Sequence, residues 1–173
     1  MSMRRAWLGL GGNIGDPVAS MAKALRALHR RSDTRVLAVS PVYRTPPWGV
    51  IDQAWFHNAC AEVTTSLQPE ALLATCLDIE KRMKRQRIER WGPRIIDIDV
   101  LAYEGEEAFE SPTLLLPHPR MTERAFVMVP LADIAPELLI SGKSVAEWSR
   151  LCDRSGIEKA RNDAGWWRQG ETQ

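Results

Sequence analysis

Apolar and polar positions along the first half of the chain change period several times, and each change marks an expected element. Residues 6–10 form a short apolar run that ends in glycines, which predicts a buried strand entering a tight turn. The next apolar positions at helical spacing are Met21, Leu25 and Leu28. Because Asp16 and Pro17 supply N-cap and first-turn chemistry just before them, we expect a helix that runs to about Arg30.

Residues 34–43 and 55–65 are rich in β-branched and aromatic residues, so they are predicted strands joined by a proline-containing loop. A second helix is expected to begin at Pro69 and to end in a basic run. Its apolar stripe is Leu72, Leu73, Cys76, Leu77 and Ile79. Residues 95–103 are the next predicted strand. The order strand, helix, strand, strand, helix, strand predicts an α+β fold of the ferredoxin-like type, a largely antiparallel sheet with two helices on one face.

The last third of the chain is expected to extend this unit. Residues 108–131 predict a hairpin followed by another strand at residues 125–129, and residues 144–151 predict a C-terminal helix. From Arg154 onward the chain is polar apart from Trp166 and Trp167, so no structure is predicted there. Because no Gly, Ser or Pro-rich linker divides the chain, we expect one domain, residues 1–156, and a tail, residues 157–173.

The charge of the chain is balanced overall and uneven locally. The formal net charge is +1, which argues against a globally basic protein that binds nucleic acid. Seven cations nevertheless fall in one short segment: Lys81, Arg82, Lys84, Arg85, Arg87, Arg90 and Arg94. Inside that window only Glu89 opposes them, so the sequence predicts a local site for an anion.

Cysteine spacing and hydropathy suggest the cellular compartment. Cys60, Cys76 and Cys152 are odd in number and show no C-x-x-C spacing, so we expect reduced thiols and no disulfide. The apolar run after Arg4 and Arg5 is too short for a secretion signal, and no run is long enough to span a membrane. We therefore expect a cytoplasmic monomer with no membrane partner.

Two aspartates in the strand at residues 95–103 are the first candidate for chemistry. Side chains alternate along a strand, so Asp97 and Asp99 face one way and Ile98 faces the other. Oxygen ligands of this kind suit Mg²⁺, which takes the rest of its shell from water and phosphates. A solvated edge strand is the alternative, but two acids of one sign beside a dense cationic segment favour metal binding.

The basic segment before that strand is the second candidate. Guanidinium groups make bidentate contacts to phosphate oxygens, so arginines around Trp91, Gly92 and Pro93 are suited to bind a polyphosphate. Cations that complement a helix C-terminus are the alternative, which explains Lys81 and Lys84 better than it explains Arg94.

The glycine-rich turn LGLGGNIGD does not match the dinucleotide pattern, because Ile14 occupies the last required glycine position. Close approach of a substrate and a tight strand-to-helix connection explain this turn equally well.

Of the histidines, His29 is expected on a solvated helix face and His57 on the outward side of a strand. His118, between two prolines, is either part of a second cationic cluster near phosphate or a packed loop imidazole.

Three long motifs carry a resemblance to a known family: YRTPPWG at residues 43–49, RWGPRIIDIDV at 90–100 and LPHPRMTERAFVMVPLADIAP at 116–136. In this order they resemble the 6-hydroxymethyl-7,8-dihydropterin pyrophosphokinases of folate biosynthesis, from about Ala6 to Trp148. The resemblance implies a ferredoxin-like fold and transfer of the terminal pyrophosphate of ATP to the hydroxymethyl group of the pterin, with AMP leaving. The expected partners are thus ATP and 6-hydroxymethyl-7,8-dihydropterin.

The resemblance also implies roles for individual residues. Asp97 and Asp99 would hold two Mg²⁺ ions that bridge the ATP phosphates. The residues implied for catalysis and ATP binding are Arg85, Arg87, Trp91, Arg94, His118 and Arg124. Those implied for the pterin pocket are Thr45, Pro46, Trp48, Phe56, Asn58 and Phe126, with Phe56 and Phe126 as a stacking pair and the Asn58 amide reading the donor and acceptor edge.

Two other functions are alternatives to the pyrophosphokinase. A ferredoxin-like RNA-binding module lacks its expected K/R-G-F/Y-G motif here, and an acidic pair would repel phosphate unless metal intervened. A nucleotidyltransferase also uses a D-x-D strand with Mg²⁺, but it would transfer AMP and release pyrophosphate. The identity of the products separates this rival from the pyrophosphokinase.

Overall fold

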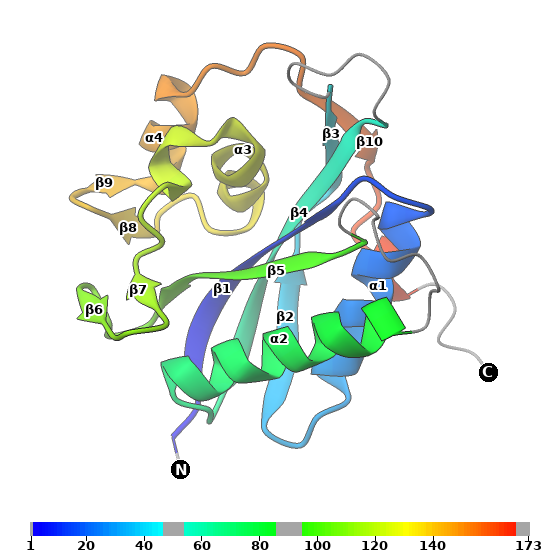
Figure 1. The fold of residues 1–173 in the computed structure, drawn as a ribbon. Coiled ribbons are helices and arrows are strands. Elements are labelled where there is room, and N and C mark those ends of the chain that lie inside the picture. Colours follow the sequence, from blue (N-terminus) through cyan, green and yellow to red (C-terminus); the bar gives the residue numbers. More distant parts are fainter. Residues whose placement is uncertain (1, 47–53, 86–94, 169–173) are drawn as a thin grey trace.

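A computed structural model describes residues 2–46, 54–85 and 95–168 of the chain, with only the backbone described at Arg85 (Figure 1). The elements of the first half are β1 (Arg4–Gly12), α1 (Pro17–His29), β2 (Thr34–Val39), β3 (Val42–Thr45), β4 (Phe56–Thr65) and α2 (Pro69–Arg85). Those of the second half are β5 (Asp97–Tyr103), β6 (Phe109–Glu110), β7 (Leu115–Leu116), η1 (Met121–Glu123), α3 (Ala125–Ile134), β8 (Leu139–Ile140), β9 (Lys143–Ser144), α4 (Val145–Leu151), β10 (Glu158–Arg161) and η2 (Trp166–Arg168).

The main sheet has six strands, in the order β10-β3-β4-β1-β5 with β2 also paired to β4. Every pairing in it is antiparallel. Along the chain, β1 to β5 and the two long helices follow the expected order, with the second expected strand divided into β2 and β3, so the predicted ferredoxin-like unit is confirmed. The predicted hairpin is also present as β6 and β7, and Ser144 caps the predicted C-terminal helix by accepting a hydrogen bond from the Glu147 N–H at 3.2 Å.

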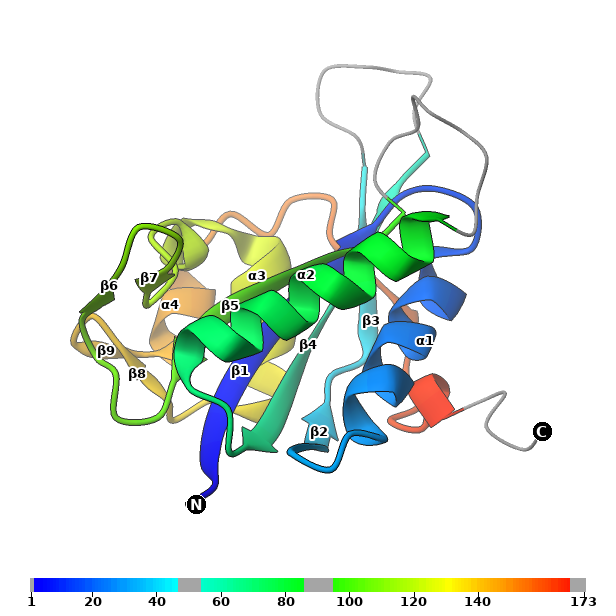
Figure 2. The same cartoon turned by 60° about the horizontal axis from the view of Figure 1, so that its bottom comes forward.

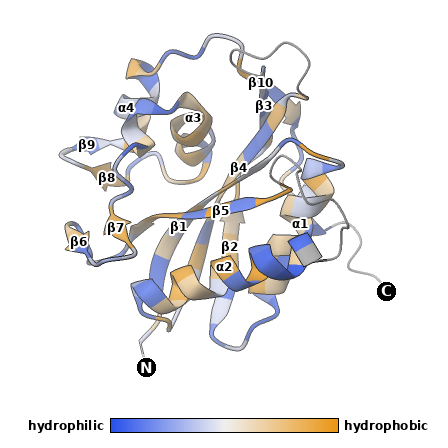
Figure 3. Ribbon diagram, viewed as in Figure 1, coloured by the Kyte–Doolittle hydropathy of each residue, from blue (hydrophilic) through white to orange (hydrophobic). Residues whose placement is uncertain are grey.

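Helices cover both faces of the sheet (Figures 1 and 2). On one face, α1 and α2 bury a core that includes Leu8, Leu10, Met21, Leu25, Leu72 and Ile98. On the other face, α3 and α4 bury a second core that includes Trp7, Cys60, Leu101, Val127, Met128, Leu131 and Val145. Figure 3 shows the difference between the helices, because hydrophobic residues extend over much of α3 whereas α2 mixes hydrophobic and hydrophilic positions.

The first two helices follow their predicted boundaries closely. Asp16 is the N-cap of α1, and its side chain accepts a hydrogen bond from the Ala19 N–H at 3.0 Å. In α2 the expected apolar stripe is buried at Leu72, Cys76 and Ile79, but Leu77 is exposed. Cys60, Cys76 and Cys152 are all free thiols, as expected.

The structure corrects three expectations. Residues 125–129 belong to helix α3 and not to a strand, because a short run without polar positions shows no periodicity that separates the two. The strand expected at 34–43 is two strands, β2 and β3, interrupted at Ser40 and Pro41. Residues 155–168 contain regular structure, since β10 pairs with β3 and both Trp166 and Trp167 are buried.

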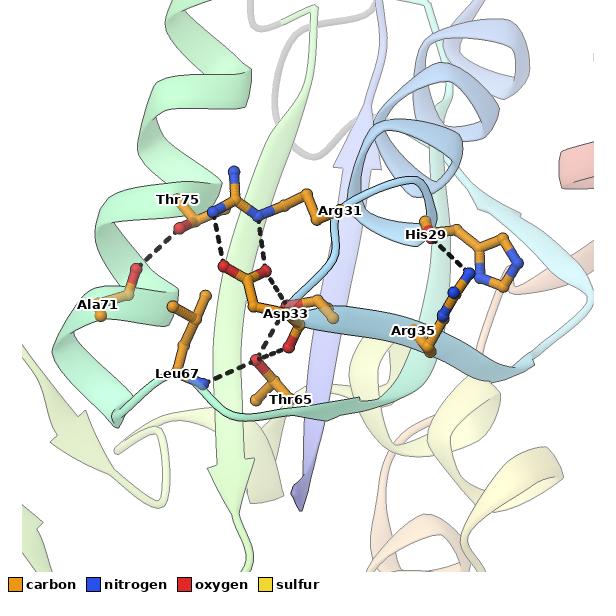
Figure 4. A network of polar contacts seen from close by, with 9 residues as sticks. His29, Arg31, Asp33, Arg35, Thr65, Leu67, Ala71 and Thr75 are labelled. Atoms are coloured by element: carbon orange, nitrogen blue, oxygen red, sulfur yellow. Dashed lines mark hydrogen bonds and ion pairs between the residues drawn. The ribbon is translucent and has the colours of Figure 1, made fainter. Parts of the chain in front are cut away.

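At the end of the sheet where β2 begins and β4 ends, polar side chains bind one another (Figure 4). The Arg31 guanidinium donates two hydrogen bonds of 2.9 Å to the Asp33 carboxylate. The buried Thr65 hydroxyl lies 2.9 Å from the Thr34 hydroxyl, donates to the Asp33 carbonyl and accepts from the Leu67 N–H. This network, which we call the distal network, joins the turn before β2 to the turn after β4.

Among the described residues, no helix combines the length and the apolar character needed to cross a membrane.

Candidate active site

The register of β4, β1 and β5 brings distant polar residues into one row. Gly11 of β1 pairs with Asn58 of β4 on one side and with Asp97 of β5 on the other. Gly9 pairs in the same way with Cys60 and Asp99. Because adjacent strands lie about 4.8 Å apart, the backbones at Asn58 and Asp97 are separated by roughly 10 Å, with only glycine between them.

A pocket of about 380 Å³ lies over this row, on the face of the sheet that α3 covers. Its lining residues are Gly9, Leu10, Gly11, Gly12, Thr45, Phe56, Asn58, Ala59, Asp97, Asp99, Arg124, Phe126 and Val127. Asp97 and Asp99 share this pocket while Ile98 and Val100 are buried against α1 and α2, which confirms the alternation expected for the strand. Pockets of this size and mixed polarity are typical of sites for small molecules.

Gly11 keeps the floor of the pocket open. A Cβ atom at this position would lie 2.5 Å from Oδ1 of Asn58, closer than side chains tolerate. The glycine therefore lets the Asn58 amide lie over the sheet beside the carboxylates. A larger residue would force the amide to turn away.

The start of α3 forms the wall opposite the sheet. Arg124 precedes the helix, and its guanidinium carbon lies 5.5 Å from the centroid of the Phe126 ring. Both residues line the pocket together with Phe56 at the start of β4. The Tyr43 hydroxyl donates a hydrogen bond to Asp133, which joins β3 to the far half of α3 and fixes the helix above the sheet.

His118 lies close to this cluster on the loop after β7. Its backbone N–H donates to the Leu101 carbonyl at 2.8 Å, which ties the loop to the strand of the aspartates. Burial lowers the pKa of His118, and the charges of Arg124 and Arg120 lower it further against the opposing effect of Asp99. The imidazole is thus neutral at pH 7, and because Nδ1 accepts from the Arg120 N–H at 3.2 Å, its proton is on Nε2.

Glu80 of α2 supports the aspartate strand from the other face of the sheet. Its Oε1 accepts a hydrogen bond of 2.6 Å from the Ile98 N–H, a backbone group between the two aspartates. Burial raises the pKa of Glu80, and the charges of Asp97 and Asp99 raise it further. Sequence analysis missed this residue, because a lone acid on an amphipathic helix gives no sign of the strand it contacts.

Seven of the residues singled out from the sequence line the pocket: Thr45, Phe56, Asn58, Asp97, Asp99, Arg124 and Phe126. Pro46 follows Thr45 directly, and His118 is near Asp99 and Arg124. Trp48, Arg87, Trp91 and Arg94 lie outside the described residues, and the side chain of Arg85 is not described.

The two other histidines differ from expectation. His29 is not on a solvated face: its Nδ1 accepts from the Val36 N–H at 3.1 Å, and its ring lies edge-on to Trp167 at 5.3 Å. His57 is half-buried, Nδ1 is buried without a hydrogen-bond partner, and burial lowers its pKa. Neither lines the pocket, so we assign both to the packing of the sheet.

No group of three or more His, Cys, Asp and Glu side chains gathers into a metal site within residues 2–46, 54–85 and 95–168. The candidate metal ligands in the pocket are therefore the pair Asp97 and Asp99. Two carboxylates on one face fit a hard divalent cation that takes its remaining ligands from water and from a substrate.

Fold and pocket together define an α+β protein with a carboxylate pair and aromatic side chains in one pocket, an arrangement suited to an enzyme that binds small molecules. Residues 7–136 match the sequence model of one protein family, which is described as "7,8-dihydro-6-hydroxymethylpterin-pyrophosphokinase". Because this match covers most of the chain, the protein belongs to that family. It is a family of pyrophosphokinases that act in folate biosynthesis, and its use of ATP points to a requirement for a divalent metal ion.

Relatives named 2-amino-4-hydroxy-6-hydroxymethyldihydropteridine pyrophosphokinase agree with this assignment. The protein of Methylorubrum extorquens is 54% identical over 157 residues, covering 91% of this chain and 99% of the relative. That of Pseudomonas aeruginosa is 41% identical over 158 residues, covering 91% and 97%.

Solved structures agree on the fold. A Plasmodium falciparum HPPK-DHPS superposes with a TM-score of 0.69 at 16% identity over 87% of this chain. An HPPK-DHPS solved in complex with substrates superposes with a TM-score of 0.70 at 13% identity over 92% of this chain. This chain spans 45% and 47% of those two longer chains, respectively.

Proposed function

We propose that this pocket transfers pyrophosphate from ATP to the hydroxymethyl group of 6-hydroxymethyl-7,8-dihydropterin, releasing AMP. The observation that carries the proposal is the row Asn58, Gly11, Asp97 across the adjacent strands β4, β1 and β5. It places an amide suited to a heterocycle about 10 Å from a carboxylate suited to metal-bound phosphates. One pocket can thus hold an acceptor and a donor end to end.

The pterin is proposed to lie at the β4 side of the pocket. Phe56 and Phe126, from opposite walls, offer flat apolar surfaces for a bicyclic ring. The Asn58 amide both donates and accepts hydrogen bonds, which matches the alternating donors and acceptors on one edge of a pterin. Thr45 and Pro46 would border the ring. The resemblance implies that Trp48 also lines the pterin pocket.

The ATP phosphates are proposed to lie at the β5 side. Arg124 and the positive end of α3 offset negative charge at the pocket wall. His118, neutral with its proton on Nε2, would donate a hydrogen bond to a phosphate oxygen. Arg85, Arg87, Trp91 and Arg94 are proposed from the resemblance to complete the contacts to ATP, with Arg85 and Arg94 stabilising the charge that builds up during transfer.

The residues would act by holding the two substrates in line. The pterin hydroxyl oxygen forms a bond to the β-phosphorus of ATP and gives up its proton to water. The bond between that phosphorus and the oxygen that bridges to the α-phosphorus breaks, and its electron pair stays on AMP. Positioning and charge stabilisation are the main demands of such a transfer, and the pocket supplies groups for both.

We propose that Asp97 and Asp99 hold two Mg²⁺ ions together with ATP. When bound, these ions would neutralise phosphate charge and orient the pyrophosphate that is transferred. Asp97 and Asp99 would fix the ions at the β5 side because the strand holds both side chains on one face, with the backbone between them held by Glu80.

The experiment that tests this function mixes the protein with Mg²⁺, ATP and 6-hydroxymethyl-7,8-dihydropterin and separates the nucleotide products. AMP that appears in step with pterin pyrophosphate supports the proposal. Free pyrophosphate with an adenylylated pterin would show a nucleotidyltransferase instead.

We further propose that the chain works as a cytoplasmic monomer with one catalytic domain.

A further inference from the structure

The last part of the chain lies against the strand that borders the proposed pterin site. We call residues 155–168 the C-terminal arm. It includes β10 and η2, and it lies beyond residues 7–136, which the family description matches. The sequence predicts no structure or role for this arm, yet the arm contacts both ends of β3.

At the pocket end of β3, the arm touches Pro46. Gly156 adopts a positive φ of 80°, and a Cβ atom there would lie 3.1 Å from both Cδ and Cγ of Pro46. The backbone of the arm is therefore in close contact with the proline that follows the pocket residue Thr45. Only a glycine allows this approach without pressing on the proline ring.

The arm also reaches the start of β4 through Arg44. The Glu158 carboxylate accepts hydrogen bonds of 3.0 and 2.8 Å from the Arg44 guanidinium, and that guanidinium lies 4.9 Å from the centroid of the Trp55 ring. Trp55 immediately precedes the pocket residue Phe56. The arm thus contacts Pro46 directly and Trp55 through one side chain, on either side of residues 47–53.

The far end of the arm is anchored beside the other end of β3. Trp166 is 1% exposed, and its indole N–H donates to the Ser40 carbonyl at 2.8 Å. The Trp167 carbonyl accepts a hydrogen bond of 3.1 Å from the Arg26 guanidinium of α1. Between these anchors and Gly156, β10 pairs with β3, so β3 is held on both sides of its length.

We infer that the C-terminal arm positions β3 and Pro46 so that Thr45 and Phe56 are set for binding the pterin. Gly156, Glu158 and Trp166 are positioning residues, which act through Pro46, Arg44 and Ser40 and do not touch the substrate. This inference rests on the proposed function, since it assigns the arm to the pterin half of that same pocket. The proposed metal ligands of the nucleotide half, Asp97 and Asp99, are on β5, at the opposite edge of the sheet from β10.

The test compares Gly156→Ala with Gly142→Ala in the full-length protein. Both glycines have a positive φ, 80° and 86°, so both variants carry the same backbone strain, but a Cβ at Gly142 has nothing within 4 Å. Binding of 6-hydroxymethyl-7,8-dihydropterin is measured by calorimetry with Mg²⁺ and α,β-methylene-ATP present, and binding of that ATP analogue is measured separately.

We expect Gly156→Ala to weaken pterin binding about five- to tenfold and Gly142→Ala to leave it unchanged. Affinity for the ATP analogue should not change in either variant. Two milder variants each remove one ion pair. Glu158→Gln removes the ion pair with Arg44 of β3, whereas Asp163→Asn removes the ion pair with Arg161, which stays within the arm. Only Glu158→Gln should weaken pterin binding, by about two- to threefold.

The inference would be overturned if Gly156→Ala and Gly142→Ala bound the pterin with equal affinity. It would also be overturned if Gly156→Ala lost affinity for the pterin and for the ATP analogue to the same extent. Neither result would contradict the proposed function. Wild-type protein that binds the ATP analogue but no pterin would instead overturn the proposed function. Thermal unfolding of each variant, run in parallel, confirms that affinities are compared on folded protein.

Discussion

The two ends of β4 use polar residues in opposite ways. At its last residue, Thr65, the distal network connects hydroxyl, carboxylate, guanidinium and backbone groups to one another (Figure 4). At its first residues, Phe56 and Asn58, about 30 Å away along the strand, polar groups converge on a pocket that also holds Asp97 and Asp99. The first arrangement connects polar groups of the protein to one another, whereas the second places two carboxylates on one face of an open pocket.

This difference separates polar residues that stabilise the fold from polar residues that are suited to bind a ligand. Polar residues that pair with each other at a sheet end fix turns and register. Polar residues that share a pocket and a sign of charge, as Asp97 and Asp99 do, are suited to a ligand that brings the opposite charge. Substitutions at the two ends should therefore affect different measurements, activity at one and stability at the other.

The largest effect is expected from Asp97→Ala or Asp99→Ala. Each change deletes a proposed metal ligand, so we expect kcat to fall about a thousandfold or more. Steady-state turnover and denaturant unfolding should be measured together, because relief of like-charge repulsion should leave the free energy of unfolding unchanged or slightly raised. Glu137→Ala, which removes an exposed carboxylate outside the pocket, is the matched control. Turnover at the wild-type rate in either aspartate variant would contradict the metal assignment.

A smaller effect is expected from Gly11→Ala. The new methyl group would lie 2.5 Å from Asn58 Oδ1, so the amide must turn away from its place over the sheet. Loss of its hydrogen bonds to the pterin should raise KM for the pterin by about 10- to 100-fold, with little change in KM for ATP. Gly165→Ala, where a Cβ has nothing within 4 Å, should behave as wild type. Parallel increases in both KM values would speak against a pterin role for Asn58.

At the distal network the expected effect moves from activity to stability. Thr65→Val keeps the shape of a buried side chain but removes the hydroxyl that contacts Thr34, Asp33 and Leu67. We expect the free energy of unfolding to fall by about 1–3 kcal/mol, with kcat and both KM values unchanged. Urea unfolding and steady-state kinetics on the same preparation check this. A change in pterin KM would mean that the two ends of β4 are coupled.

The smallest effect is expected from Asp33→Asn. Hydrogen bonding to Arg31 lowers the pKa of Asp33 below its usual value of 3.8. Its stabilising contribution is therefore fully present above that value and is lost as pH falls through the lowered pKa. Because the pair is partly exposed, we expect the variant to be less stable by under about 1 kcal/mol at pH 7. The difference should shrink below pH 3.8, and a difference that persists in strong acid would contradict this cause.

Sequence alone predicts the parts of this structure that depend on local periodicity. Alternation places Asp97 and Asp99 on one face, and the capping chemistry of Asp16 and Ser144 marks the starts of α1 and α4. Pairing across strands is not local. Nothing near Asn58 in the sequence indicates that it lies two strands from Asp97, because that neighbourhood depends on the register of β1 with both partners.

The two main errors have the same physical origin. An apolar run such as residues 125–129 contains no polar position that would reveal its period, so the sequence predicts a strand where the structure has α3. Trp166 follows a polar stretch, and its burial depends on Ser40, a residue 126 positions away in the chain. In both cases long-range contacts decide the structure, and local composition does not record them.

The strands at the borders of the main sheet have a consequence for association between chains. β10 has only four residues, three of them charged: Glu158, Lys159 and Arg161. At the opposite border, β5 carries Asp97 and Asp99, and Glu80 occupies the Ile98 N–H. Short, charged or capped border strands offer a poor template for strand addition by another molecule. β10 and β5 are therefore poor templates for edge-to-edge association with another chain.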